Sequence, residues 1–341
     1  MSKENKILGN PGEGKQIPSL LRRATEDSLI NRVIEGKDNA TIPAPAVHRS
    51  IEDVILGRVP LAGERLTGVN GETLAFNHNN YLAIAGKDGY LRVFHFVEMK
   101  TGQVSFIKVA EEEQPAPVRS IAFNEDDFLA VAYESNSVRL FEFCQTINSV
   151  NNRNLLNYLN LKGKLKFEHA DIKKLAFVKK HNFYVGFSDG TINKYIDKIP
   201  TGLASNDKIG CEATKMAFSP DGKYVAVHHD EEGGIVFKYP ELEQIGSTYT
   251  GYRDVDAMAF VPGCNMFAMG WERWVRFYEF DADKKYVKQI DAEKVVNRNS
   301  DYVDELHTVK AIAFSPDGKY MAVGNPEHVK LFDVKFNERT E

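Results

Sequence analysis

An eleven-residue phrase occurs twice in this chain of 341 residues, as AFSPDGKYVAV at residues 217–227 and AFSPDGKYMAV at residues 313–323. Shorter versions occur at four other places, so that the dipeptide Ala-Phe recurs at intervals of 41 to 54 residues. The six phenylalanines are Phe76, Phe123, Phe177, Phe218, Phe260 and Phe314. Sequence periods of about 20–50 residues are typical of solenoids, propellers and arrays. The repeat therefore predicts a fold built from several copies of one structural unit.

Each copy has the same internal order. A turn-rich stretch such as NHNN, NEDD or SPDG follows Ala-Phe, and then come a short apolar run, a second turn and a strand that ends in an aromatic residue. Such apolar runs, punctuated by Asn, Asp, Gly and Pro, indicate strands joined by tight turns. The runs are apolar on both faces rather than alternating. This pattern predicts small antiparallel sheets that stack face to face around an axis.

The spacing within the repeat is regular. The distance from the Phe of Ala-Phe to the aromatic residue of the third strand is 18 residues in five copies and 21 in the fourth. The six residues reached in this way are Phe94, Phe141, Tyr195, Tyr239, Tyr278 and Phe332. We predict that these six side chains occupy equivalent places in six sheets and hold neighbouring sheets together.

This pattern resembles the WD-repeat β-propeller family, which has a similar period, an S-P-D-G turn and a third strand like V-R-L-W-D. The resemblance covers about residues 47–336. Phe or Tyr replaces the family's Trp in every copy, and the Asp that follows is kept only as Asp333. In the family, His, Ser or Thr, Asp and Trp side chains form a hydrogen-bonded network within the blade. This chain lacks the residues for that network in most blades. Burial of aromatic residues must therefore hold the blades together.

The expected fold is all-β, a propeller of four-stranded antiparallel blades with six recognisable repeats. The last motif ends with its third strand at residues 329–334, and the resemblance implies that the N-terminal segment supplies the missing outer strand. Residues 51–59 are the best candidate for this strand. A six-bladed ring closed in this way is the first choice, and a seven-bladed ring with a degenerate or partner-donated blade is the alternative.

Several segments do not fit the repeat. Two insertions, at residues 144–162 and 291–308, lengthen connections of the propeller, and such loops often carry binding functions. The N-terminal extension has a helical pattern at about residues 18–35, followed by a linker that contains proline. The predicted organisation is an N-terminal extension at 1–46, a WD-like propeller at 47–336 and a C-terminal tail at 337–341.

Net charge and apolar segments indicate which kinds of partner to expect. The net charge of −5 favours neither nucleic acid nor a membrane surface. The N-terminus lacks the apolar core of a signal peptide, and no apolar run approaches the ~20 residues that span a bilayer. We therefore expect a cytoplasmic protein without membrane insertion, for which nucleic acid is an improbable partner. The three cysteines, Cys144, Cys211 and Cys264, lie too far apart to indicate a disulfide set or a zinc site.

Four short motifs have ordinary explanations. GNPGEGK at residues 9–15 lacks the Ser or Thr of a P-loop and is expected to be a tail. RRAT at 22–25 resembles a kinase site, and phosphorylation of Thr25 is left open. HHDEE at 228–232 is expected to be a solvated turn rather than a metal site. The stretch 162–180 holds seven lysines and could touch phosphate, but it lacks aromatic stacking residues and is expected to be a solvated blade edge. No cofactor or metal is therefore expected.

Function follows from the fold rather than from a catalytic motif. The chain shows no nucleophile elbow, H-E-x-x-H pair or repeated Asp-box. We expect a non-catalytic protein-interaction scaffold, a subunit of a multiprotein complex that binds other proteins through propeller faces, loop insertions and the N-terminal helix. The alternative is a propeller enzyme or small-ligand binder with a site in the central channel.

The expected binding face is centred on the fifth repeat, where the turn GWERW at 270–274 replaces the usual Asp-Gly. The resemblance places this turn on the same face as the loop TGYRD at 250–254. Aromatic and Arg side chains are frequent anchors of protein interfaces. The alternative for the Trp of this turn is packing into the adjacent blade. The predicted binding residues are Trp271, Arg273, Tyr252, Arg253, His229 and Asp230.

Overall fold

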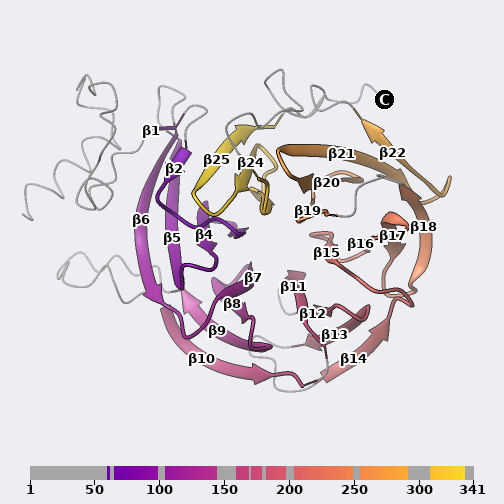
Figure 1. Ribbon diagram of the computed structural model, residues 1–341, viewed down its shortest axis with the longest axis horizontal. Coiled ribbons are helices and arrows are strands. Elements are labelled where there is room, and N and C mark those ends of the chain that lie inside the picture. The colour runs from indigo at the N-terminus through magenta and orange to yellow at the C-terminus, as the bar shows by residue number, and fades with distance from the viewer. Residues whose placement is uncertain are drawn as a thin grey trace, which may run out of the picture.

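The computed structural model describes nine stretches of the chain. They are residues 60–61, 65–98, 104–143, 159–168, 170–178, 182–196, 203–248, 254–290 and 308–334. These stretches form six antiparallel sheets that stand around a central axis as the blades of a propeller (Figure 1). The predicted all-β propeller of four-stranded blades is confirmed, and it has six blades. The predicted N-terminal helix lies outside the described residues.

The blades follow one another around the ring in chain order, with the first strand of each blade nearest the axis (Figure 1). Blade 1 has β3 (Thr73–Phe76), β4 (Tyr81–Ala85), β5 (Tyr90–Glu98) and β6 (Val104–Glu113), with β1 (Pro60–Leu61) paired to β6. Blade 2 has β7 (Val118–Phe123), β8 (Phe128–Tyr133), β9 (Ser137–Phe143) and β10 (Leu159–Lys166). Blade 3 has β11 (Ile172–Val178), β12 (Asn182–Phe187), β13 (Thr191–Ile196) and β14 (Leu203–Lys208).

The remaining blades repeat this order. Blade 4 has β15 (Lys215–Phe218), β16 (Tyr224–His229), β17 (Gly233–Lys238) and β18 (Glu243–Thr248). Blade 5 has β19 (Ala257–Phe260), β20 (Met266–Trp271), β21 (Trp274–Asp281) and β22 (Tyr286–Ile290). Blade 6 has β23 (Ala311–Phe314), β24 (Tyr320–Gly324) and β25 (His328–Asp333), and its outer strand is β2 (Arg65–Thr67) from the other end of the chain.

The strand register confirms five of the six predicted aromatic positions. In blade 2, for example, Phe123 and Phe141 lie opposite the same residue of the second strand, Leu129. The prediction for blade 4 is wrong. There Val225 lies between Phe218 and Phe237, so that Phe237 occupies the equivalent place. The sequence carries two aromatic residues close together at this point, and the strand ends before the second one, Tyr239.

Burial of these aromatic residues joins neighbouring blades. The third-strand aromatic is buried in five blades, whereas Phe332 in blade 6 is half-buried. Phe141 belongs to a core cluster that also contains Leu91 and Val93 of blade 1. Tyr239, although it follows its strand, is buried as well, and its hydroxyl donates a hydrogen bond of 2.7 Å to Asp207 of blade 3. Apolar contact between sheets is therefore the main attraction between blades.

The repeated Ser-Pro-Asp-Gly phrase forms the turn between the first and second strands. In blade 4 the hydroxyl of Ser219 accepts a hydrogen bond of 2.9 Å from the backbone nitrogen of Tyr224 and donates one of 2.7 Å to Asp221. Blade 6 repeats this pattern with Ser315, and there the φ angle of Gly318 is 69°. A positive φ of this size is open to glycine at little cost. The repeated phrase is thus a structural unit.

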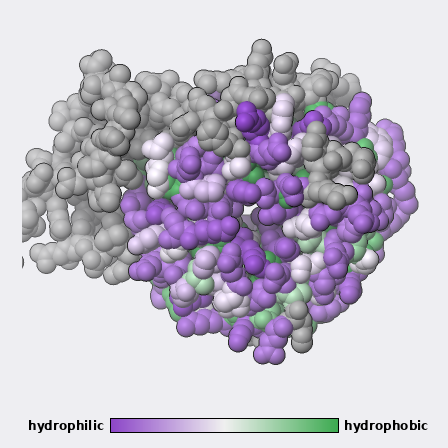
Figure 2. Space-filling model, viewed as in Figure 1, coloured by the Kyte–Doolittle hydropathy of each residue, from purple (hydrophilic) through white to green (hydrophobic). Residues whose placement is uncertain are grey.

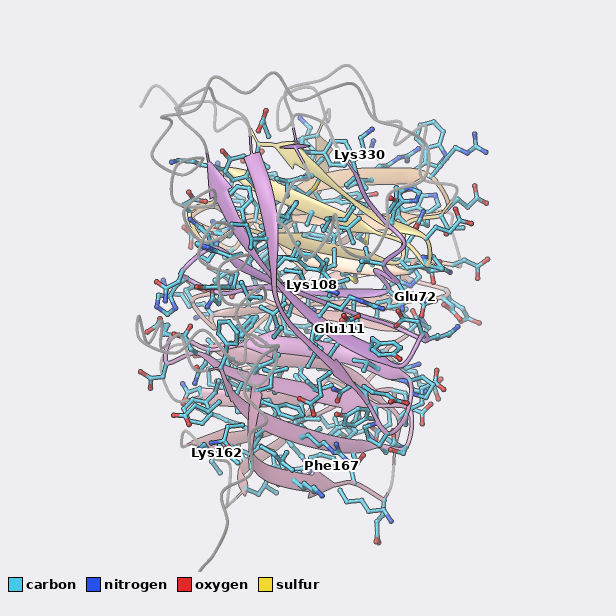
Figure 3. The ribbon with its side chains drawn as sticks, turned by 90° about the vertical axis from the view of Figure 1, so that its left-hand side faces the viewer. Glu72, Lys108, Glu111, Lys162, Phe167 and Lys330 are labelled. Carbon is cyan, nitrogen blue, oxygen red and sulfur yellow. The ribbon has the colours of Figure 1, made fainter. Side chains whose placement is uncertain are left out.

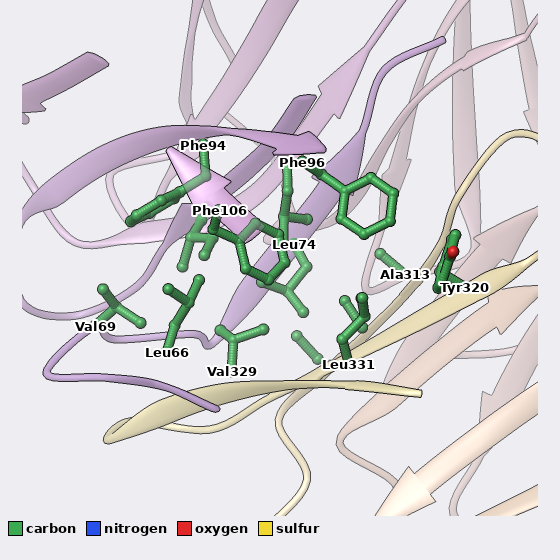
Figure 4. Packing of buried hydrophobic residues seen from close by; sticks show 14 residues of the cluster. Leu66, Val69, Leu74, Phe94, Phe96, Phe106, Ala313, Tyr320, Val329 and Leu331 are labelled. Atoms are coloured by element: carbon green, nitrogen blue, oxygen red, sulfur yellow. The ribbon is translucent and has the colours of Figure 1, made fainter. Parts of the chain in front are cut away.

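The N-terminal segment closes the ring, but with another strand than the one expected. Residues 51–59 lie outside the described residues, and β2 pairs antiparallel with β25, with Leu66 opposite Val329. Leu66 is 3% exposed and belongs to one apolar cluster with Val69 and Leu74 of the N-terminal side and with Leu331 of blade 6 (Figure 4). The three residues of β2, Arg65–Thr67, therefore join the N-terminal side of the propeller to blade 6.

Blades 1 and 6 also meet through backbone atoms. The backbone nitrogen of Gly71 donates a hydrogen bond of 2.7 Å to the carbonyl of Asn325. A Cβ atom on Gly324 would lie 2.1 Å from the carbonyl oxygen of Gly71, which is backbone and cannot rotate away.

We expect Gly324→Ala to lower the free energy of unfolding by about 1–3 kcal/mol, because the added methyl group overpacks this contact. Urea denaturation measures the difference. Gly234→Ala is the control, because its Cβ meets side-chain atoms alone, the end of Met269 at 3.1 Å and the methyl group of Thr248 at 3.2 Å. Equal stability of the two variants would contradict the close approach.

Candidate interaction surface

Two sets of loops share one face of the propeller. The connections that enter the first strands contact the turns between the second and third strands. In blade 1 the backbone nitrogen of Lys87 donates a hydrogen bond of 3.1 Å to Glu72, and in blade 3 that of Ser188 donates one of 2.9 Å to the carbonyl of Asp171. The side view shows Glu72 and Phe167 toward one side of the ring and Lys162 toward the other (Figure 3). We name the side formed by these two sets of loops the turn face.

The side chain of Trp271 is buried and is not exposed on the turn face. Its side chain is 2% exposed and belongs to a core cluster with Ala217 and Ala226 of blade 4. The indole is therefore buried in the core between blades 4 and 5. The guanidinium of Arg276 lies 5.2 Å from the centre of the indole ring. The structure thus has the alternative packing, in which the indole fills the space between blades and is not offered to a partner.

Arg273 is an exposed residue at the tip of the same turn. Trp271 and Trp274 pair across the hairpin, and the two residues between them, Glu272 and Arg273, are both exposed. Glu272 has a φ of 43°, a left-handed conformation that tight hairpins need. Its carbonyl accepts a hydrogen bond from the backbone nitrogen of Val309 at the entry to blade 6. The tip is therefore held in place while the guanidinium faces solvent.

The acidic turn of blade 4 lies on the same face. Nδ1 of His229 accepts hydrogen bonds of 3.3 Å from the backbone nitrogens of Glu231 and Glu232, so that the imidazole holds the turn together. Asp230 is exposed, as are both glutamates. His228 is fully buried instead, with Nδ1 2.8 Å from the hydroxyl of Thr214. Within the described residues, no group of three His, Cys, Asp or Glu side chains is placed to hold a metal ion.

The remaining predicted binding residues, Tyr252 and Arg253, lie outside the described part of the chain. The structure thus places Arg273 on the turn of blade 5 and Asp230 on the turn of the neighbouring blade 4, with His229 as the residue that shapes the second turn. The surface view is mostly hydrophilic around a small central opening (Figure 2). Whether these residues bind a partner stays a prediction.

The sequence did not predict a groove that lies between blade 3 and the connection leading into it. Its volume is about 310 Å³, near the lower end for ligand sites. Phe167 and Phe187 meet edge to face in its wall, with ring centres 5.2 Å apart. The polar lining residues are Glu168, Asp189, Thr191, Asn193 and Asn206. Phe167 lies in the connection between β10 and β11, and Phe187 lies 20 residues later at the end of β12, so folding of the connection onto blade 3 brings them together.

Comparison with known proteins agrees with this architecture. The family described as "WD domain, G-beta repeat" matches residues 302–333, which include the whole of the sixth repeat from Ala-Phe to its third strand. No curated protein matches the chain. A chain from a structure entitled "Crystal Structure of Mitotic Checkpoint Complex" matches with a TM-score of 0.52 and 13% identity, covering 88% of this chain and 98% of that chain. At this identity the likeness shows the fold alone.

The chain is therefore similar to WD-repeat β-propellers in one sequence repeat and in its whole described fold, as the sequence pattern indicated. The family's Trp is absent at the third-strand position of every blade. The structure shows what replaces it, which is burial of Phe or Tyr between sheets. Among the described residues there is also no helix of the length and apolarity needed to cross a bilayer.

Proposed function

We propose that this protein is a non-catalytic interaction scaffold, a WD-repeat-like subunit that binds other proteins through the turn face. The observation that carries the proposal is the construction of this face. Its turns are fixed by backbone hydrogen bonds at their bases, and their tips present charged side chains to solvent. A rigid surface of this kind loses little conformational entropy on binding, which favours affinity.

The charges on neighbouring blades give this surface a polarity that a partner could match. Blade 5 contributes the guanidinium of Arg273, and blade 4 contributes the carboxylates of Asp230, Glu231 and Glu232. Complementary charge sets the rate and the specificity of protein association. The solved chain with the same fold comes from a structure whose title names a multiprotein complex, which supports a role as a subunit.

The proposal is tested by affinity purification of the tagged full-length chain from its native source, followed by mass spectrometry. We expect a reproducible set of co-purifying proteins. The variant Arg273→Glu should recover at least one of them about tenfold less, since loss of an interface anchor costs more than ~1 kcal/mol and reversal of its charge adds repulsion. The control is Lys164→Glu, an equal change of charge at an exposed position of the outer strand β10. Equal recovery of every protein with both variants would exclude Arg273 as an anchor, and a chain that purifies alone would contradict the scaffold itself.

A further inference from the structure

The central channel of the propeller is positively charged although the chain carries a net charge of −5. A cavity of about 60 Å³ lies between the first strands of the blades. Its charged lining residues are Glu72, Arg119, Lys173, Lys174, Lys215, Asp256 and Lys310, which are five cations and two anions. They come from all six blades, since the inner strands stand around one axis (Figure 1).

Ion pairs neutralise only part of this charge. Lys310 lies 2.7 Å from Asp256 of the neighbouring blade 5, and Glu72 lies 3.8 Å from Lys87 of its own blade. In the described part of the chain, no carboxylate lies within 4.0 Å of the ammonium groups of Lys173, Lys174 or Lys215. Among the described residues, three half-buried lysines on the adjacent strands β11 and β15 therefore have no carboxylate within ion-pair distance.

A fourth cation beside them is only partly satisfied. Nη1 of Arg119 lies 3.2 Å from the exposed carboxylate of Asp171. The two groups are nevertheless not aligned for a hydrogen bond, and this buried nitrogen makes none within the described residues. The hydroxyl of Ser120, the next residue, accepts a hydrogen bond of 3.0 Å from the backbone nitrogen of Leu175 and so ties β7 to β11 at this level.

The backbone places two of these cations in the channel by the same device. The inner strand of blade 2 has a register shift between Val118 and Ser120, and that of blade 3 has one between Ile172 and Lys174. The extra residue is Arg119 in the first case and Lys173 in the second. The inner strands of the other four blades pair with their second strands without a shift. Bulges re-aim side chains and are frequent beside functional sites, and here each one adds a cation.

This arrangement is costly for the protein alone. Burial, and then the charge of Lys215, lower the pKa of Lys174 to about 8. Burial also lowers the pKa of Lys215, with smaller contributions from Lys173, Lys310 and Arg119 that oppose the effect of Asp256. Cations held this close repel one another, and an anion between them would remove the repulsion.

We propose that this cluster is a binding site for one phosphate group, held by Lys173, Lys174 and Lys215 with Arg119 at its edge. The cavity volume of about 60 Å³ is far below the ~300–1,000 Å³ of pockets that hold drug-sized ligands, so it suits a small tetrahedral oxyanion. A phosphate group carries about −1.5 to −2 charges at pH 7, which matches three cations better than a carboxylate does. The site does not depend on the proposed scaffold function.

The test is isothermal titration of the full-length chain with inorganic phosphate, at an ionic strength kept constant with chloride. We expect one phosphate to bind per chain. Lys174→Gln and Lys215→Gln should each weaken binding about tenfold, the usual range for loss of one charge-assisted hydrogen bond. Lys164→Gln, on the outer strand, should leave it unchanged. Affinity should also fall between pH 7 and pH 9, as Lys174 loses its proton, and this fall should be smaller in Lys174→Gln.

The phosphate could belong to a free small molecule or to a phosphorylated side chain of a partner. A capped pentapeptide with a central phosphoserine, titrated beside its unphosphorylated form, separates the two sources. Tighter binding of the phosphopeptide than of inorganic phosphate would indicate a partner's side chain, and equal or weaker binding would indicate a free ligand. Both results support the site. No heat beyond that of matched chloride at millimolar phosphate, or equal binding by wild type and both lysine variants, would overturn it.

The lysine variants also provide a check on folding. Because each removes a repelling charge, they should melt at the same temperature as the wild type or at a higher one when phosphate is absent. In the wild type, added phosphate should raise the melting temperature, since a ligand of the native state alone stabilises it. A rise of the same size in the double variant Lys174→Gln and Lys215→Gln would place the bound anion elsewhere and contradict the proposal.

Discussion

Replacement of Phe141 by Ala should lower the free energy of unfolding by about 3–5 kcal/mol. The ring is 1% exposed and belongs to a core cluster that joins Leu91 and Val93 of blade 1 to Leu129 of blade 2. Truncation removes this buried area and leaves a cavity that a rigid ring of sheets closes poorly. Since natural proteins are stable by only about 5–15 kcal/mol, the variant should be close to unfolding at 37 °C. Urea denaturation at 25 °C measures the difference.

The matched control for this experiment is Phe332→Ala, the same change at the equivalent position of blade 6. That ring is half-buried and lies past the residues of β25 that pair with β2, so less area is lost. We expect it to cost clearly less than Phe141→Ala. If the two variants were equally destabilised, burial between blades would not be the source of the effect. A loss below about 1 kcal/mol at Phe141 would contradict the packing itself.

Leu66→Asp should open the ring between β2 and β25. Within the described residues, this is the one place where a strand from the N-terminal side completes a blade from the C-terminal side. Leu66 pairs with Val329 and is 3% exposed, so that a carboxylate here is buried without a partner. An uncompensated buried charge costs about 3–5 kcal/mol. We expect blade 6 to lose its outer strand first, which would appear as faster amide exchange in His328–Asp333 than in the strands of blade 3.

Thr67→Asp provides the control for this second experiment. It places the same charge one residue later, on the exposed side of the same strand, and surface changes of this kind are usually within ~0.5 kcal/mol. The comparison separates the effect of burial from that of charge. Equal stability and equal exchange in the two variants would show that β2 does not hold blade 6.

Much of the fold follows from local sequence. Each blade carries its own turn residues and apolar runs, and the resulting strand pairs are formed by neighbours in the chain. The prediction of the closing strand was wrong because that strand pairs with a segment far away in the sequence. Residues 51–59 have the apolar run of a strand, whereas Arg65–Thr67 is short and is stabilised by a pairing that spans nearly the whole propeller. Such a pairing depends on the completed ring and leaves no local signal.

The candidate sites were harder to predict because they combine distant blades. The lysine-rich stretch 162–180 was treated as one solvated edge, but the chain passes there from the outer strand of blade 2 to the inner strand of blade 3. Lys164 therefore lies on the outside, whereas Lys173 and Lys174 line the channel beside Lys215. For Trp271, the core cluster that buries the indole includes residues of the preceding blade, such as Ala226 and Val236.

The most direct test of this account is an experimental structure of the full-length chain at a resolution that shows individual strands. It should show six sheets around one axis, with Arg65–Thr67 hydrogen-bonded to His328–Lys330 and with Phe94, Phe141, Tyr195, Phe237, Tyr278 and Phe332 at equivalent positions. A ring of seven sheets, or another segment paired to His328–Lys330, would contradict it.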